Sequence, residues 1–254
     1  MNIQYFTATG NFRGNNEDAI LIDKKVISMT DMEECQNEEI YTVKAIFAVA
    51  DGMGGHPEGE TAAKLTLETI AESVQNSNAL SIEEILLKAR DVLESYAEKN
   101  PQALGLGCAV AGVLLERDRA TAFNVGDCRA YLLRKGELIK LTKDYTLFEE
   151  MVRNGLISDN ELEEHPYRNI LTSAITGDGY KMEIKIHTET INIETDDKFL
   201  ICSDGLWSEV NNEEIKLSLS SPNPCEALRK SMESRLQKDN FTFIVVQNPN
   251  NIKQ

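Results

Sequence analysis

Residues 45–56, AIFAVADGMGGH, give the strongest single indication of the fold. Six mostly apolar residues end at Asp51, glycines follow, and a helix-like pattern begins near Pro57. A short apolar run bounded by glycines is typical of a buried strand. A carboxylate at the end of that strand, followed by glycines, lets bare backbone approach a ligand or an ion. Taken alone, the stretch is equally compatible with a tight strand-to-helix turn in which Asp51 caps the helix.

The length and composition of the chain are those of an ordinary globular protein. A chain of 254 residues, 41% hydrophobic and 27% charged, suits one large domain. We predict that this domain spans 1–247 and that 248–254 form a tail. No apolar run approaches the roughly 20 residues needed to cross a bilayer, and the N-terminus lacks the pattern of a secretory signal. We therefore expect a cytoplasmic, monomeric protein with no membrane partner.

The net charge indicates which partners are disfavoured, and the cysteines and histidines indicate which kinds of site are disfavoured. The net charge of −16 disfavours nucleic acid and anionic membranes and favours cations. The cysteines are odd in number and never form a C-x-x-C pair, which predicts buried reduced thiols rather than a zinc site or disulfides: Cys35, Cys108, Cys128, Cys202 and Cys225. Three dispersed histidines do not suggest a histidine-rich metal site.

Hydrophobic periodicity predicts a chain rich in strands with helices between them. Strands are expected at 3–9, 19–29, 41–50, several within 105–133, and at 137–141, 181–193, 199–204 and 241–246. Helices are expected at 60–74, from Ser81 to Pro101, at 211–220 and at 223–236. The acidic segment 30–39 is interpreted as a solvated hairpin tip. The polar segment 142–179, with one short helix ended by Asn154 and Gly155, is predicted to be a functional flap or a mobile loop.

Acidic residues recur at the boundaries of the predicted strands. Two predicted strands end in Asp-Gly, at Asp51 and Asp204. Two others begin directly after carboxylates, one after Glu17 and Asp18 and one after Asp239, and a hairpin tip carries Asp127. In an antiparallel sheet the end of one strand lies beside the start of its neighbour, so these side chains can meet at one edge of a two-sheet core.

Clustered carboxylates repel one another unless a cation lies among them. Oxygen ligands suit magnesium, manganese or calcium. Two such ions about 4 Å apart, sharing one carboxylate, would activate a bridging water for phosphoryl hydrolysis. The alternative is that these aspartates are independent turn and capping residues. It is disfavoured because so many of them lie at strand boundaries.

Five motifs, in this order along residues 13–242, carry a resemblance to a known family. They are Arg13-x-x-Asn16-Glu17-Asp18, Asp51-Gly52-Met53-Gly54-Gly55-His56, Gly126-Asp127-Cys128-Arg129, Ser203-Asp204-Gly205-Leu206-Trp207 and Asp239-Asn240-Phe241-Thr242. The chain resembles the metal-dependent protein Ser/Thr phosphatases of type 2C, in their compact bacterial form. The resemblance implies an α+β fold, a four-layer α-β-β-α sandwich of two antiparallel sheets flanked by helix pairs, with 142–179 as the flap beside the active site.

The resemblance also implies a role for each acidic residue and a cofactor of two Mn²⁺ or Mg²⁺ ions. Asp51 would bridge the two ions and the Gly52 carbonyl would bind one of them. Asp204 and Asp239 would complete the shell of the other. Waters bound to the metals would be held by Glu17 and Asp18. Asp127, with Asp204, resembles the site of a third, weaker ion.

Catalysis in this family implies phosphorylated proteins as partners, which a Ser/Thr protein kinase would supply. Arg13 would bind the substrate phosphate in a bidentate manner, and Asp18 belongs to the catalytic set. No Cys or Ser nucleophile is expected, because an activated water attacks phosphorus directly.

Three departures from the family pattern concern the acid and the substrate range. Animal members usually carry a histidine, a candidate general acid, at the position of Met53. His56 is the substitute acid, although a structural role for it is equally compatible with the sequence. The flap opens with Asp-Tyr at 144–145 instead of Asp-His, and residues 106–109 replace a common Met-Gly-Thr-Thr.

Two other functions are weaker interpretations of the same motifs. One is the branch that dephosphorylates partner proteins controlling transcription factors, which generally lacks the Arg-x-x-Asn-Glu-Asp motif found here. The other is a non-catalytic phosphoprotein-binding pseudophosphatase, which would be expected to have lost a metal ligand.

Overall fold

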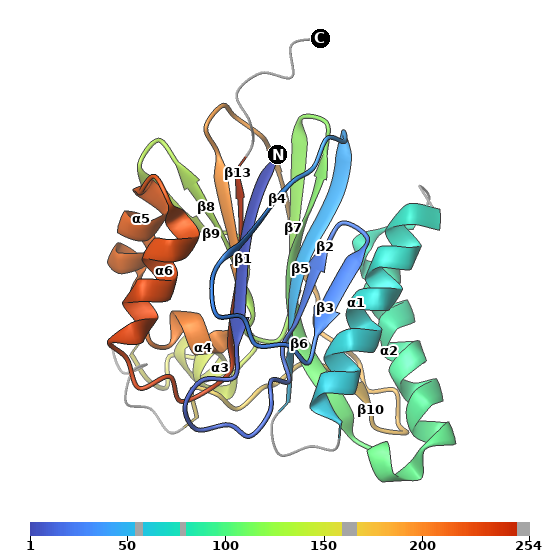
Figure 1. Ribbon diagram of the computed structural model, residues 1–254. Helices are drawn as coiled ribbons and strands as arrows, with labels where there is room; N and C mark the ends of the chain where they lie inside the picture. Colours follow the sequence, from blue (N-terminus) through green and yellow to red (C-terminus); the bar gives the residue numbers. More distant parts are fainter. Residues whose placement is uncertain (54–57, 77–79, 159–166, 248–254) are drawn as a thin grey trace.

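The computed structural model describes residues 1–53, 58–76, 80–158 and 167–247. His56 and the predicted tail 248–254 lie outside these segments. Two antiparallel sheets stand face to face between two layers of helices (Figure 1), so the predicted four-layer α-β-β-α sandwich is confirmed.

The first sheet brings together strands from both ends of the chain. Its order is β4 (Gln36–Glu39), β1 (Asn2–Ala8), β13 (Phe241–Gln247), β12 (Lys198–Cys202), β8 (Arg129–Arg134) and β9 (Glu137–Lys140). The second sheet has the order β11 (His187–Asn192), β7 (Arg119–Val125), β6 (Leu106–Glu116), β5 (Lys44–Gly52), β2 (Ala19–Ile22) and β3 (Lys25–Ser28), and β10 (Ile175–Gly177) pairs with β6.

The helices cover the outer faces of both sheets (Figure 1). The second sheet is covered by α1 (Gly59–Asn76) and α2 (Ile82–Lys99), and the first by α5 (Asn212–Ser220) and α6 (Pro224–Glu233). The shorter α3 (Leu147–Arg153) and α4 (Asp204–Trp207) lie at the lower end in Figure 1, and η1 (Pro101–Ala103) follows α2. The predicted start of α2 is confirmed, because Ser81 and Glu84 form a capping box. Within the described segments, no helix combines the length and the apolarity that a membrane crossing requires.

Strand β5 explains why the sequence pattern of 45–50 is an unbroken apolar run. Phe47 and Val49 pack in the core between the two sheets, whereas Ile46, Ala48 and Ala50 pack beneath the helices α1 and α2. A strand buried on both faces needs apolar side chains at every position.

Three predicted segments differ from the structure. Residues 19–29 form a hairpin of β2 and β3 rather than one strand, with Asp23 in the left-handed region at φ 54°. Segment 30–39 ends in β4, which pairs with β1 and so is not merely a hairpin tip. Its polar sequence hid this pairing, because an edge strand is held by backbone hydrogen bonds whatever its side chains. The strand predicted at 181–193 is confined to β11.

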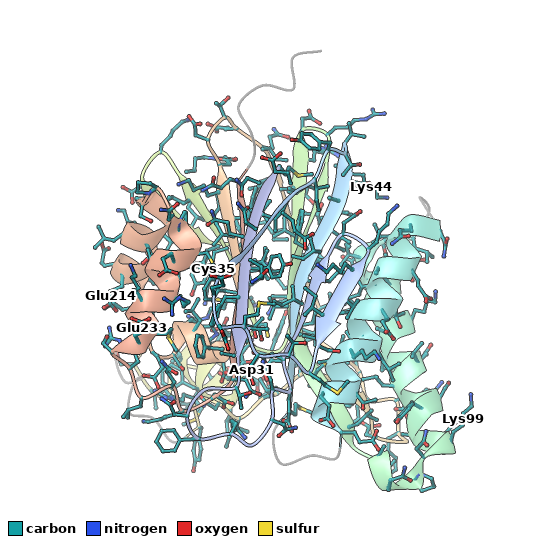
Figure 2. All side chains as sticks on the ribbon, viewed as in Figure 1. Asp31, Cys35, Lys44, Lys99, Glu214 and Glu233 are labelled. Carbon is teal, nitrogen blue, oxygen red and sulfur yellow. A yellow bond between two sulfur atoms is a disulfide. The ribbon has the colours of Figure 1, made fainter. Side chains whose placement is uncertain are left out.

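The expectation that all cysteines are reduced was wrong for two of them. Cys35, before β4, forms a disulfide with Cys225 on α6 (Figure 2). The two residues are separated by 190 positions in the chain, so only the packing of α6 against the first sheet brings their Cα atoms to 6.1 Å. Cys108, Cys128 and Cys202 are free and buried, as predicted.

Candidate active site

The register of the strands brings the predicted carboxylates to one end of the sandwich. In the second sheet Ala19 lies opposite Ala50, so the preceding Asp18 is brought next to Asp51. In the first sheet Cys202 lies between Arg129 and Phe243. The segments just beyond these pairs carry Asp204, Asp127 and Asp239. The carboxylates from the two sheets lie around one cavity of about 690 Å³, which we call the catalytic cavity. Its lining includes Arg13, Asp51, Asp127, Asp204 and Asp239, together with residues within 169–184.

Asp18 lies beneath this cavity and is almost completely buried, with 1% of its surface exposed. Its Oδ2 accepts a hydrogen bond from Ser203 Oγ at 2.8 Å, and the Thr242 amide donates to the same Ser203 hydroxyl at 3.0 Å. The other carboxylate oxygen of Asp18 has no hydrogen-bond partner in the described part of the chain. A buried acceptor without a donor is costly unless a water or a cation-bound group completes it.

Asn240 fixes the loop between β1 and β2 against the start of β13. Its Oδ1 accepts from the Glu17 amide at 2.8 Å, and its Nδ2 donates to the carbonyls of Thr9 at 2.9 Å and Asn15 at 3.0 Å. Ser203 and Asn240 are positioning residues to which sequence reasoning gave no role. The available signal was their place inside the motifs, directly beside Asp204 and Asp239.

The glycines of the two Asp-Gly pairs allow backbone segments to touch. A Cβ on Gly52 would lie 2.5 Å from the carbonyl oxygen of Gly59 and 2.8 Å from that of Glu17. A Cβ on Gly205 would lie 2.0 Å from the carbonyl oxygen of Asn240. Larger residues would push the ends of β5 and β12 away from the neighbouring segments and separate the carboxylates.

Four carboxylates at this end of the sandwich, Asp18, Asp51, Asp127 and Asp204, have raised pKa values. Burial, followed by repulsion from neighbouring carboxylates, raises the pKa of Asp18 to about 7 and that of Asp204 to about 6. The same two causes raise the pKa of Asp51 and of Asp127 well above the usual value. Asp204 is also within hydrogen-bonding reach of Asp51. Such a set of oxygen donors fits a hard divalent cation, which would stabilise the ionised forms.

The side chains are not already arranged around a single ion. Within the described residues, no three His, Cys, Asp or Glu side chains form a ready-made metal cluster. Asp239 instead forms an ion pair with Arg13, with Nη2 2.5 Å from Oδ2. This ion pair occupies one of the two carboxylate oxygens of Asp239.

The remaining predicted site residues lie around this cavity. Arg13 is exposed at its rim, and Glu17 is half-buried next to Gly59, where burial raises its pKa. Met53 lines the cavity and its amide donates to the Gly107 carbonyl at 3.0 Å. The facing side of the cavity is formed by residues 169–184, part of which belongs to the predicted flap.

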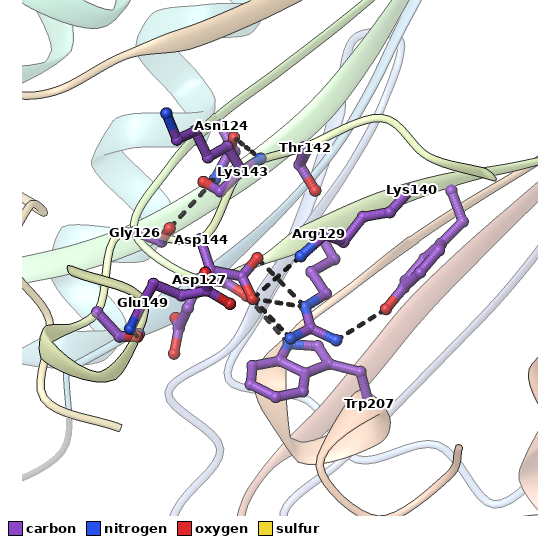
Figure 3. A network of polar contacts seen from close by, with 12 residues as sticks. Asn124, Gly126, Asp127, Arg129, Lys140, Thr142, Lys143, Asp144, Glu149 and Trp207 are labelled. Carbon is purple, nitrogen blue, oxygen red and sulfur yellow. Dashed lines mark hydrogen bonds and ion pairs between the residues drawn. The ribbon is translucent and has the colours of Figure 1, made fainter. Parts of the chain in front are cut away.

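Arg129 connects the start of the flap to the carboxylate end of the sandwich (Figure 3). Its Nη2 lies 2.6 Å from Asp144 Oδ2, and its Nη1 donates to the Tyr131 hydroxyl at 3.0 Å. The guanidinium carbon lies 3.4 Å from the centre of the Trp207 ring, and Trp207 Nε1 donates to the Asp127 carbonyl at 3.0 Å. Arg129 and Trp207 were quoted in the motifs without a role, and this stacked pair could not be inferred from sequence positions so far apart.

Comparison with known proteins places the chain in a family. The sequence pattern described as Protein phosphatase 2C matches residues 36–241. The serine/threonine protein phosphatase PstP of Mycobacterium tuberculosis is 31% identical over 215 residues, which cover 82% of this chain and 41% of PstP. The chain thus corresponds to about two fifths of the length of that relative.

Two solved structures show the similarity of the fold. The serine/threonine phosphatase Stp1 of Staphylococcus aureus has a TM-score of 0.80 and 27% identity, with 98% of this chain and 95% of that chain covered. The catalytic domain of PstP in complex with two manganese ions has a TM-score of 0.72 and 26% identity, covering 96% and 98% of the two chains. The match to the family pattern extends over most of the sequence, and the chain belongs to the protein phosphatase 2C family.

Proposed function

We propose that this protein is a divalent-metal-dependent protein serine/threonine phosphatase with two Mn²⁺ or Mg²⁺ ions. The observation that carries the proposal is the convergence of carboxylates from both sheets on one cavity with Arg13 at its rim. Membership of the protein phosphatase 2C family supports the reaction, and the solved relative with two manganese ions supports the cofactor. When bound, the ions would activate a water and neutralise the phosphoryl oxygens.

The residues of the chain divide into those that hold cations and those that hold water. Asp51, Asp204 and Asp239 would hold the two ions with the Gly52 carbonyl, and Asp127 would hold a third with Asp204. Asp18 has an unpartnered oxygen below the cavity, which suits it to accept a hydrogen bond from a water there. Glu17 would hold a second water. Burial of these carboxylates in a region of low dielectric strengthens each of these interactions.

Arg13 is the proposed phosphate-binding residue. Its guanidinium now contacts Asp239, and when Asp239 binds a cation the fork of N–H groups becomes available to a phosphate. A planar guanidinium holds two phosphate oxygens at once and so orients the phosphorus for attack. Met53 lines the cavity but has no proton to donate, so His56 is the proposed general acid.

The proposed substrates are phosphorylated proteins that a Ser/Thr kinase produces, bound by a monomer. Residues 169–184 form the face of the catalytic cavity opposite the carboxylates, where they would contact the chain on either side of the phosphorylated residue. Loops of this kind usually determine which substrate is accepted.

The test is hydrolysis of p-nitrophenyl phosphate and a phosphothreonine peptide with added Mn²⁺. We expect EDTA to abolish both activities and Asp204→Asn to do the same at saturating Mn²⁺. Asp118→Asn, at an exposed turn outside the cavity, is the matched control and should retain activity. Activity that survives both EDTA and Asp204→Asn would overturn the proposal. Phosphoprotein binding without Mn²⁺ binding in calorimetry would indicate the non-catalytic alternative instead.

A further inference from the structure

A second cavity, of about 480 Å³, lies on the other side of the residues that carry the metal carboxylates. We call it the basic pocket and define it by Arg129, Arg168, Trp207, Arg235 and Lys238. Trp207 belongs to α4, which begins at Asp204, and Lys238 directly precedes Asp239. Arg168 directly precedes Asn169, which lines the catalytic cavity. Several short segments of the chain therefore contribute adjacent residues to both cavities.

Trp207 forms part of the partition between the two cavities. Its indole nitrogen donates to the backbone carbonyl of Asp127, whose residue lines the catalytic cavity, while Trp207 itself lines the basic pocket. Figure 3 shows Arg129 stacked on this ring with its guanidinium directed at Asp144. Arg129 is buried and held by Asp144 and Tyr131, so it forms part of the pocket lining and is not available to a ligand. The cations available to a ligand in the basic pocket therefore come from other residues.

The charge of the basic pocket is opposite to that of the whole molecule. Its lining contains four Lys or Arg residues against two carboxylates, Glu209 and Glu214, in a chain with a net charge of −16. Asp144, which is not part of the lining, pairs with Arg129, so the positive excess comes from the other three cations. Arg235 contacts Glu214 at 2.5 Å, and the Lys238 side chain is exposed. A local excess of positive charge inside a concave site attracts anions, and the remaining negative surface repels them elsewhere.

The shape of the pocket selects the kind of anion. A nucleic acid or a membrane requires an extended basic surface, which an acidic chain does not offer. A cavity of this volume has room for an acidic side chain of a bound polypeptide together with part of its neighbouring backbone. Its position beside the catalytic cavity means that a peptide with its phosphorylated residue at the carboxylates passes close to the pocket.

We propose that the basic pocket binds an acidic side chain, Asp or Glu, located a few residues from the phosphorylated residue of the same substrate. This inference rests on the proposed phosphatase function and adds a substrate preference to it. Lys238, with Arg235 beside it, supplies charge-assisted hydrogen bonds to the carboxylate, and the exposed part of Trp207 contacts its methylene groups. The preference weakens with increasing salt, because the pocket is open to solvent.

The experiment compares alanine-based phosphothreonine peptides in which one glutamate is moved through each flanking position. We expect kcat/KM to rise about fivefold to tenfold at one or two positions, the range of a partly exposed charge-assisted hydrogen bond. Lys238→Ala and Arg235→Gln should each reduce that ratio to about twofold or less. Lys230→Ala removes an exposed positive charge from α6 outside the pocket and should leave the ratio unchanged.

Hydrolysis of p-nitrophenyl phosphate separates this inference from the proposed function. The substrate is too small to reach the basic pocket, so Lys238→Ala should reduce the acidic-peptide rate by a larger factor than the p-nitrophenyl phosphate rate. Equal rates for glutamate and alanine peptides at every position, with p-nitrophenyl phosphate hydrolysed normally, would overturn the inference alone. A glutamate preference that persists in both variants would also overturn it. Absence of all Mn²⁺-dependent hydrolysis would overturn the phosphatase function and the inference with it.

Discussion

The two sides of the catalytic cavity are built in different ways. We call the carboxylate side the floor (Asp18, Asp51, Asp127, Asp204 and Asp239) and residues 142–186 the wall. The floor is placed by the ends of continuous antiparallel strands, whose register leaves each carboxylate little freedom. The described part of the wall contains only α3 and β10 as regular elements. Its attachment includes the Arg129–Asp144 contact and the Glu94 carboxylate, which accepts from the Gly179 amide at 2.9 Å and the Lys181 amide at 3.0 Å.

In the proposed phosphatase, the floor would carry out the chemistry and the wall would set the substrate selectivity. A floor built from sheet register keeps charged groups at fixed positions even though they repel one another, because moving one of them would shift an entire strand. A wall with little regular structure of its own can change its sequence and shape more readily than the floor. Substitutions in the floor, in the wall and at the contact between them test that division.

The largest effect is expected from Asp51→Asn in the floor. Loss of the proposed shared metal ligand should reduce kcat for p-nitrophenyl phosphate by about 10³-fold or more. The metal-free protein should become more stable, since burial and neighbouring carboxylates raise the pKa of Asp51 and make its ionised form costly. Thermal unfolding in EDTA measures this second effect. A fall in Tm of several degrees would mean that Asp51 supports the fold rather than opposing it.

Arg129→Ala tests the joint between the floor and the wall. The change leaves Asp144 buried without its guanidinium partner and removes the stacking on Trp207, so we expect a loss of about 3–5 kcal/mol in the free energy of unfolding. Urea denaturation provides the measurement. Arg229→Ala on α6 breaks only ion pairs within one surface helix and should cost less than about 1 kcal/mol. Similar losses of unfolding free energy for the two variants would show that the contact between floor and wall at Arg129 does not stabilise the fold more than a surface ion pair does.

The pH dependence of the metal-free protein reports the cost of burying ionised carboxylates in the floor, with their mutual repulsion as the second cause. The pKa of Asp204 rises from 3.8 to about 6 and that of Asp18 to about 7, so the folded state keeps protons that the unfolded chain has lost. Their contribution is fully present below about pH 4 and is lost as the pH rises to about 7, on the order of 3 kcal/mol for Asp204.

Saturating Mn²⁺ should reverse this trend, because cation binding requires the ionised carboxylates. The difference in Tm between Mn²⁺-bound and metal-free protein should therefore widen between about pH 5 and pH 7. Asp204→Asn should flatten the metal-free curve over the same interval. A difference in Tm that stays constant with pH would contradict the assignment of these carboxylates as the cation site.

A smaller effect is expected from Glu94→Gln, which weakens the attachment of the wall to α2. A glutamine can accept at only one of the two amides, so the free energy of unfolding should fall by about 1–3 kcal/mol. Hydrogen exchange at Gly179 and Lys181 should accelerate while exchange in β5 is unaffected. Equal acceleration in β5 would show that floor and wall open together.

The smallest effect is expected from Lys185→Ala, which removes an ion pair with Glu150 within the wall. The Lys185 side chain is half-exposed, so the expected change in unfolding free energy is below about 1 kcal/mol and should disappear in high salt. Double-mutant analysis with Glu150→Ala measures the coupling. A coupling above about 2 kcal/mol would indicate a wall as tightly fixed as the floor.

Much of the floor could be predicted from local sequence. The apolar run of β5, the capping box of α2 and the carboxylates at strand boundaries follow from interactions between residues close in the chain. The hairpin at 19–29 was missed because its turn at Asp23 lacks glycine and proline. The edge strand β4 was missed because its charged side chains resemble a loop.

Local sequence is enough to predict which segments are strands buried on both faces and which carboxylates lie at their ends, because hydrophobic periodicity and Asp-Gly boundaries are local properties. Only the tertiary structure decided that Cys35 bonds to Cys225, that Arg129 stacks on Trp207 and that a basic pocket lies behind the carboxylates. The stacked pair joins residues 78 positions apart and the disulfide joins residues 190 positions apart. Their partners are selected by how two sheets and their helices pack, and no spacing within one segment records that packing.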